Sequence, residues 1–131
     1  MPEIKRIEPG RRFSEAVVCD GVVYISGQVD LARNRDPKVQ TAEVLKTIDD
    51  LLAKAGSDKE HILRCTVYLS NMGYFSEMNQ AWEEWVSKSN PPARSVLESA
   101  LPDPSWKVQI STVAVVAGRT YIIFNKTSLT H

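Results

Sequence analysis

The sequence predicts an α+β fold in which a mixed β-sheet carries two helices on one face. Apolar and β-branched runs bounded by turn residues indicate several strands, and Asp20-Gly21 joins two of them as a two-residue hairpin turn. Two longer segments, at about 39–55 and 73–89, repeat apolar residues at helical spacing. Two helices packed on one face of a mixed sheet suit this chain length and this number of elements.

The first strands lie before residue 30. Residues 3–8 alternate weakly and are expected to form an extended edge that leads into a loop. Residues 14–19 and 22–26 form the predicted hairpin. Its second strand ends at Ser26-Gly27-Gln28, where glycine permits a turn and its neighbours present polar groups.

The middle of the chain is predicted to form a helix, a strand and a second helix. The first helix, 39–55, ends at Gly56. Residues 62–69 alternate and are expected to form a strand, with Leu63, Cys65, Val67 and Leu69 on one face. The second helix, 73–89, has Asn71 as a candidate cap and an apolar, largely aromatic stripe of Phe75, Met78, Trp82, Trp85 and Val86.

Asn79 lies on the buried side of the second predicted helix. An amide without partners there costs about 1 to 3 kcal/mol. The residue is therefore expected either to brace a loop or to line a pocket.

Arg94 follows a rigid entry into the next strand. Pro91 and Pro92 hold the backbone extended, so residues 93–98 are predicted to be a strand with Arg94 near its start. A guanidinium group there suits a carboxylate or phosphate, because its paired donors match an oxyanion. A structural salt bridge is the alternative role.

The long strand predicted at 107–116 follows a turn at 101–105. Gln109 and Ser111 share one face of this otherwise apolar strand. That face is therefore expected to be exposed to water, to form part of a functional site or to contact another subunit. Residues 121–124 are expected to add a last hairpin strand.

Composition narrows the classes of function. The 131 residues suit one domain, and sixteen basic residues balance sixteen acidic ones, which argues against nucleic-acid or membrane partners. No apolar run suits a membrane span or a signal peptide, so we expect a cytoplasmic protein. Cys19 and Cys65 are expected to be buried free thiols, and His61 and His131 form no metal-binding pair.

Several of these motifs together resemble the RidA/YjgF family, also called L-PSP endoribonuclease-like. The resemblance covers about residues 4–116 and rests on Ser26-Gly27-Gln28, Asn79, Pro92-Ala93-Arg94-Ser95 and the strand at 107–116. It implies a chorismate-mutase-like fold and a homotrimer whose sheets form a central barrel, with small-molecule sites between subunits. Members of the best-known branch hydrolyse enamines and imines to a 2-oxo acid and ammonia, without a metal or bound cofactor.

The resemblance also assigns roles to single residues. Arg94 matches the arginine that grips the substrate carboxylate, while Ser26 and Asn79 match polar positions around the same cleft. Phe13 stands where the deaminating branch has a tyrosine, and Gln109 where it has the glutamate that positions water.

Gln109 makes the catalytic competence of the site an open question. An amide has no useful basicity, and general-base help is typically worth ~10²-fold to 10⁴-fold in rate. We therefore expect either slow deamination or a non-catalytic carboxylate-binding trimer, with ribonuclease activity a weaker alternative. Glu15 is the one carboxylate that a neighbouring subunit is expected to be able to bring to the cleft as a replacement base.

Overall fold

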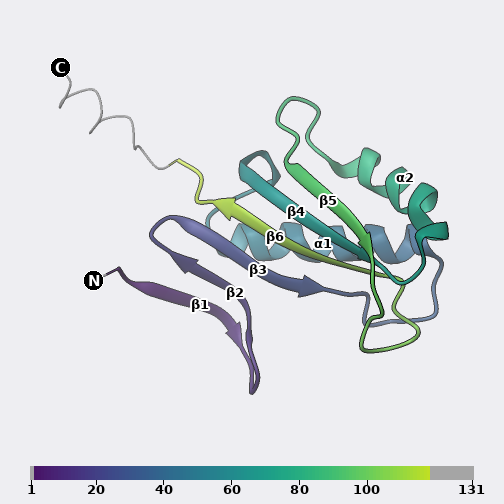
Figure 1. The fold of residues 1–131 in the computed structure, drawn as a ribbon. Coiled ribbons are helices and arrows are strands. Elements are labelled where there is room, and N and C mark those ends of the chain that lie inside the picture. The colour runs from purple at the N-terminus through teal and green to yellow at the C-terminus, as the bar shows by residue number, and fades with distance from the viewer. Residues whose placement is uncertain (1, 119–131) are drawn as a thin grey trace.

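The computed structural model describes residues 2–118 and confirms the α+β fold (Figure 1). The additional strand expected at 121–124 lies outside the described residues. The strands are β1 (Ile4–Pro9), β2 (Ser14–Cys19), β3 (Val22–Gln28), β4 (Ile62–Leu69), β5 (Ala93–Glu98) and β6 (Val108–Val115). The helices are α1 (Pro37–Lys54) and α2 (Phe75–Trp85), and Lys59–His61 and Met72–Tyr74 form short 3₁₀ turns.

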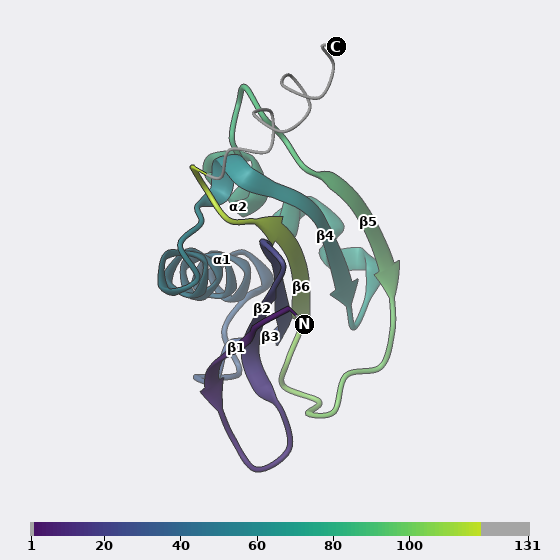
Figure 2. The same cartoon turned by 90° about the vertical axis from the view of Figure 1, so that its left-hand side faces the viewer.

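The six strands form one sheet in the order β1-β2-β3-β6-β4-β5. Neighbouring strands are antiparallel except β4 and β5, which are parallel because α2 carries the chain back between them. The hairpin predicted at Asp20-Gly21 is present, and both residues have the positive φ that its tight turn requires. Beyond the pair Ala16–Ile25, β2 leaves β3, and the β1–β2 ribbon extends away from the sheet (Figures 1 and 2).

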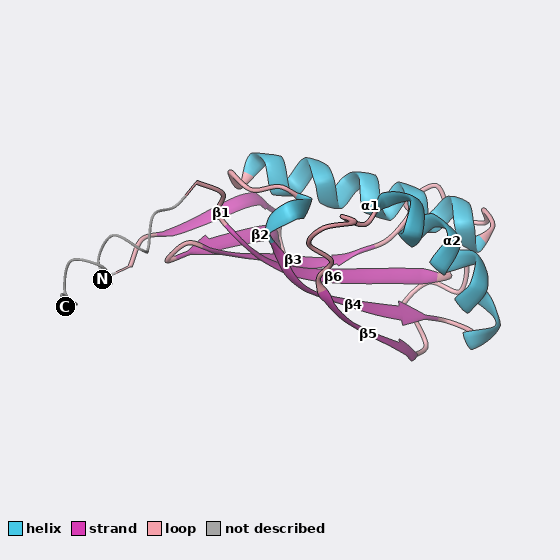
Figure 3. Cartoon of the chain, turned by 90° about the horizontal axis from the view of Figure 1, so that it is seen from above, coloured by secondary structure: helices cyan, strands magenta, loops and turns pink. Residues whose placement is uncertain are grey.

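Both helices pack on the same face of the sheet (Figure 3). The core lies between the two layers, with Leu45, Ile48 and Leu52 of α1 among its fully buried side chains. Trp85 Nε1 donates a hydrogen bond to Asp49 Oδ2 at 3.0 Å, which ties α2 to α1. Within residues 2–118, no helix is long and apolar enough to cross a membrane.

Within residues 2–118, the two helices leave the opposite face of the sheet uncovered (Figure 3). Its apolar side chains include Tyr24, Leu63 and Leu97, which are 49%, 51% and 40% exposed. Removing such a surface from water is favourable, at roughly 25 cal/mol per Å² of apolar area. This face is therefore suited to contact with another protein surface.

The helix boundaries differ from those predicted. Asp36 caps α1 by accepting a hydrogen bond from the Val39 backbone N–H, and Pro37 occupies the first turn, so the helix starts before residue 39. Asn71 caps the 3₁₀ turn rather than α2 itself. Phe75 is 42% exposed, against the expectation of a buried stripe, because α2 begins at this residue and its first buried side chain is Met78.

One prediction of a strand face and one prediction of burial were wrong. The register shifts between Ile62 and Arg64, and this bulge turns Leu63 out to the uncovered face while Cys65, Val67 and Leu69 stay buried. Cys65 is buried as predicted, whereas Cys19 is only half-buried. Three residues after the buried Ala16, Cys19 lies on the opposite face of β2, which the helices do not cover.

Candidate functional site

Arg94 is braced by side chains of α2. Its Nη1 donates a hydrogen bond to Asn79 Oδ1 at 2.8 Å, and its guanidinium carbon lies 4.9 Å from the ring centroid of Trp82. The ring face attracts the cation electrostatically. Asn79 therefore braces the arginine, a role that neither of its two predicted alternatives described.

No carboxylate neutralises Arg94 within residues 2–118. The ion pairs of this region involve Arg33, Arg35, Lys38, Lys54 and His61, and Arg94 is in none of them. The alternative of a structural salt bridge therefore finds no support here. A guanidinium group has five N–H donors, so a half-buried arginine with neutral partners keeps donors for an anion.

Gln109 lies at a cavity of about 740 Å³. Among the lining residues are Phe13, Glu15, Gly27, Trp106 and Gln109. Gly27 leaves room for the glutamine, because a Cβ atom at that position would lie only 2.8 Å from Gln109 Cδ. The predicted turn glycine thus serves close packing against the site.

The cavity opens where β2 separates from β3. Ser26 Oγ donates a hydrogen bond to the Ser14 carbonyl at 2.7 Å and so links the two strands, but Ser26 is not among the lining residues. Next to it, Gln28 Nε2 donates to Glu15 Oε1 at 3.0 Å. Phe13 lines the cavity and is 57% exposed.

Arg94 and Gln109 lie on opposite faces of the sheet in one chain. Arg94 is level with Cys65 and then with Thr112, whose thiol and hydroxyl are 3.5 Å apart on the helix-covered face. Gln109 alternates with the buried Val108 and Ile110, so it projects to the uncovered face. Two strand spacings and three residues along β6 separate their Cα atoms by about 14 Å.

The predicted site residues therefore form two groups. Arg94 and Asn79 come together under α2, and Phe13 and Gln109 come together at the cavity. A carboxylate at position 109 would not meet Arg94 of its own chain. Glu15 reaches the cavity from the same chain as Gln109, so no neighbouring subunit is needed to bring it there.

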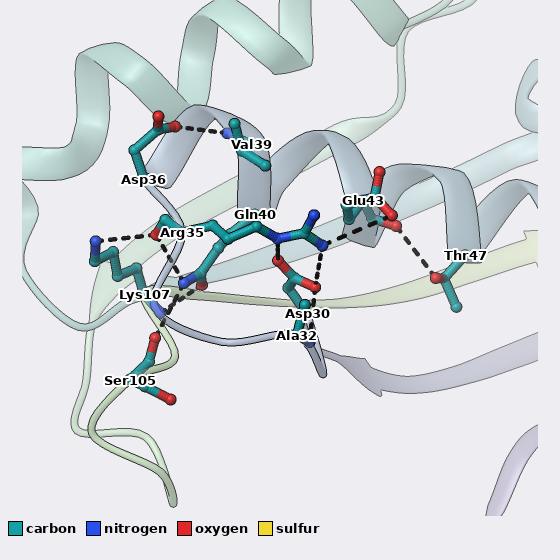
Figure 4. A network of polar contacts seen from close by, with 10 residues as sticks. All are labelled: Asp30, Ala32, Arg35, Asp36, Val39, Gln40, Glu43, Thr47, Ser105 and Lys107. Carbon is teal, nitrogen blue, oxygen red and sulfur yellow. Dashed lines mark hydrogen bonds and ion pairs between the residues drawn. The ribbon is translucent and has the colours of Figure 1, made fainter.

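A polar network fixes one wall of the cavity (Figure 4). Gln40, fully buried on α1, donates through Nε2 to the carbonyls of Arg35 and Ser105, each at 3.0 Å, and accepts from the Lys107 N–H at 2.8 Å. It joins the loop after β3 to the chain entering β6. The sequence signal was a glutamine on the buried face of the first helix, which our sequence analysis missed.

Asp30 and Arg35 complete this wall. Asp30 accepts two hydrogen bonds from Arg35, at 2.8 and 2.7 Å, and this pairing holds the pKa of Asp30 below its ordinary value near 3.8. Burial raises the pKa of the Cys65 thiol, against the smaller effects of Thr112 and Arg94. Within residues 2–118, no three His, Cys, Asp or Glu side chains come together as a metal site.

Comparison with known proteins decides the family. A family model described as Endoribonuclease L-PSP matches residues 3–116. The chain belongs to this family. A RutC family protein of Haemophilus ducreyi is 45% identical over 113 residues, covering 86% of this chain and 97% of that protein.

Solved structures of YjgF and Rid proteins share the fold. A YjgF family member from Neisseria meningitidis has a TM-score of 0.86 and 39% identity, covering 89% of this chain and 98% of that one. A Rid family protein of unknown function from Yersinia pestis has a TM-score of 0.80 and 30% identity, covering 87% and 100%. The resemblance to the RidA/YjgF family is thus confirmed, and family membership supports a RidA-like role.

Proposed function

We propose that this protein hydrolyses small enamine or imine carboxylates to a 2-oxo acid and ammonia in the cytoplasm, as a homotrimer. The observation that carries the proposal is Arg94, half-buried, braced by Asn79 and without a carboxylate partner in the described chain. In a member of the RidA/YjgF family, such a cation is suited to the carboxylate of the substrate.

A shared site is supported by the separation of the two groups of residues. Since Arg94 and Gln109 lie on opposite faces of one sheet, one ligand contacts both only if two copies supply them. The uncovered apolar face of the sheet favours such self-association. In the trimer, Arg94 of one copy would then lie beside the Gln109 cavity of the next.

A non-catalytic carboxylate-binding trimer is the second candidate function. Gln109 favours it, because the amide holds a water molecule without accepting its proton. The family model is described as an endoribonuclease. Ribonuclease activity is disfavoured because sixteen basic residues balance sixteen acidic ones, which leaves no net positive charge to attract RNA.

The proposal is tested with 2-aminoacrylate generated in a coupled assay. The wild type is expected to accelerate its disappearance. Arg94→Ala is expected to weaken binding of a small 2-oxo acid by about tenfold or more, since a charge-assisted fork contributes roughly 1.5 to 3 kcal/mol.

Lys46→Ala is the control for the loss of a positive charge. Lys46 is exposed on α1, away from the uncovered face that self-association is proposed to bury. Wild type that binds the 2-oxo acid without consuming the enamine would favour the binding trimer. Equal affinity in wild type and Arg94→Ala would refute the role of Arg94.

A further inference from the structure

We propose that Glu15 is the general base of this protein and replaces the glutamate that Gln109 lacks. The inference rests on the proposed imine hydrolysis and names the residue that performs its proton transfer. It starts from the cavity at Gln109, which three carboxylates line: Glu15, Asp30 and Glu43.

Asp30 is unsuited to accept a proton. Arg35 donates to both of its oxygens, and Oδ1 also accepts the Ala32 N–H at 3.1 Å. These bonds stabilise the ionised carboxylate and lower its pKa, which weakens it as a base.

Glu43 lines the cavity from α1 but lies beside a cation. Its Oε1 is 3.9 Å from Arg35 Nη2 (Figure 4). The guanidinium competes with a water molecule for this carboxylate, whereas Glu15 is in none of the ion pairs within residues 2–118.

Glu15 meets the geometric requirements. It lines the same cavity as Gln109, at the end of β2 that has separated from β3. Gln28, itself 7% exposed, donates to Glu15 Oε1 at 3.0 Å and to the Ser26 carbonyl at 3.0 Å. One carboxylate oxygen is thus held by a neutral amide, while Oε2 has no hydrogen-bond or ion-pair partner within residues 2–118 and can contact water.

The proton transfers balance with this residue alone. Water attacks the carbon of the protonated imine, the C=N π electrons move to nitrogen, and Glu15 Oε2 takes a proton from the attacking water. Glu15 then returns that proton to the nitrogen. The C–N bond breaks with its electron pair on nitrogen, the hydroxyl oxygen becomes the carbonyl, and the hydroxyl proton leaves with ammonia as ammonium.

Gln109 then has a positioning role. Its amide offers both a hydrogen-bond donor and an acceptor to the attacking water, while Glu15 on β2 accepts the proton. A glutamate restored at position 109 should accordingly compensate for the loss of Glu15.

The test compares imine hydrolysis in wild type, Glu15→Gln, Gln109→Glu and the double variant Glu15→Gln/Gln109→Glu. Glu15→Gln retains a side-chain oxygen as acceptor for Gln28, so it is expected to fold normally. We expect its kcat to fall ~10²-fold to 10⁴-fold with unchanged 2-oxo acid binding. The kcat of the double variant is expected to be at least tenfold higher than that of Glu15→Gln. Glu84→Gln, on the exposed surface of α2, is the matched control and should equal wild type.

The outcomes separate this inference from the proposed function. If wild type hydrolyses the imine and Glu15→Gln is equally fast, Glu15 is not the base, and the proposed function stands. The same holds if Glu43→Gln, rather than Glu15→Gln, abolishes turnover. If wild type binds no 2-oxo acid and leaves the imine untouched, the proposed function itself fails.

Discussion

At the scale of single residues, the cavity depends on Gly27. The Gln109 side chain packs where a Cβ atom of residue 27 would stand, 2.8 Å from its Cδ. A contact this short forces the glutamine to move, because atoms of β3 and β6 are fixed by the sheet.

We therefore expect Gly27→Ala to displace Gln109 and to lower kcat for imine hydrolysis by about tenfold, at little cost in stability. Gly10→Ala is the matched control, because a Cβ atom there meets only the Phe13 carbonyl at 3.5 Å, an ordinary contact. A Gly27→Ala variant as active as Gly10→Ala would show that the packing of Gln109 on Gly27 has no catalytic importance.

Arg94 and Asn79 show how far the sequence reaches at this scale. The double proline and the strand alternation predicted that Arg94 lies near the start of a strand. Helical periodicity predicted that Asn79 is on the buried side of a helix and needs a hydrogen-bond partner. Neither pattern predicted that these two side chains bond each other, since a contact between a helix and a strand depends on how α2 crosses the sheet. The family resemblance identified the candidate site residues, and the tertiary structure shows which of them lie together.

At the scale of elements, Gln40 fixes two loops to α1. Its buried amide makes three hydrogen bonds, to backbone groups of Arg35, Ser105 and Lys107 (Figure 4). These loops include the chain that leads into β6 and so to Gln109.

Gln40→Leu should lower the free energy of unfolding by about 2 to 4 kcal/mol, because it leaves buried backbone groups without partners. Urea unfolding of wild type and variant measures the difference. Gln80→Leu, a change of the same residue type at an exposed position of α2, is expected to stay within about 0.5 kcal/mol of wild type. Similar losses in both variants would rule out a specific role for the Gln40 network.

The strands were predicted more accurately than their irregularities. Alternation correctly placed Val108 and Ile110 opposite Gln109 on β6. It failed at Leu63, because a bulge adds one residue to β4 and reverses the faces beyond it. The pairing partner on β6 determines such a bulge, and periodicity within a single segment contains no information about that partner.

At the scale of the whole molecule, the central claim is a site shared between copies. One face of the sheet carries both helices, and the other exposes apolar side chains (Figures 2 and 3). The separation of Arg94 from the Gln109 cavity requires that the arginine come from another chain if both act on one ligand.

The most direct test co-expresses Arg94→Ala with Gly27→Ala and measures imine hydrolysis by the mixed assembly. In a ring of three chains with sites between neighbours, about a quarter of the sites in an equal mixture combine an intact Arg94 with an intact cavity. Light scattering serves as the control and should give three times the 14.7 kDa of one chain for wild type and mixture. We predict that imine hydrolysis by the mixed assembly exceeds that of either variant alone by about a quarter of the wild-type activity. Activity no higher than the mean of the two variants would contradict a shared site.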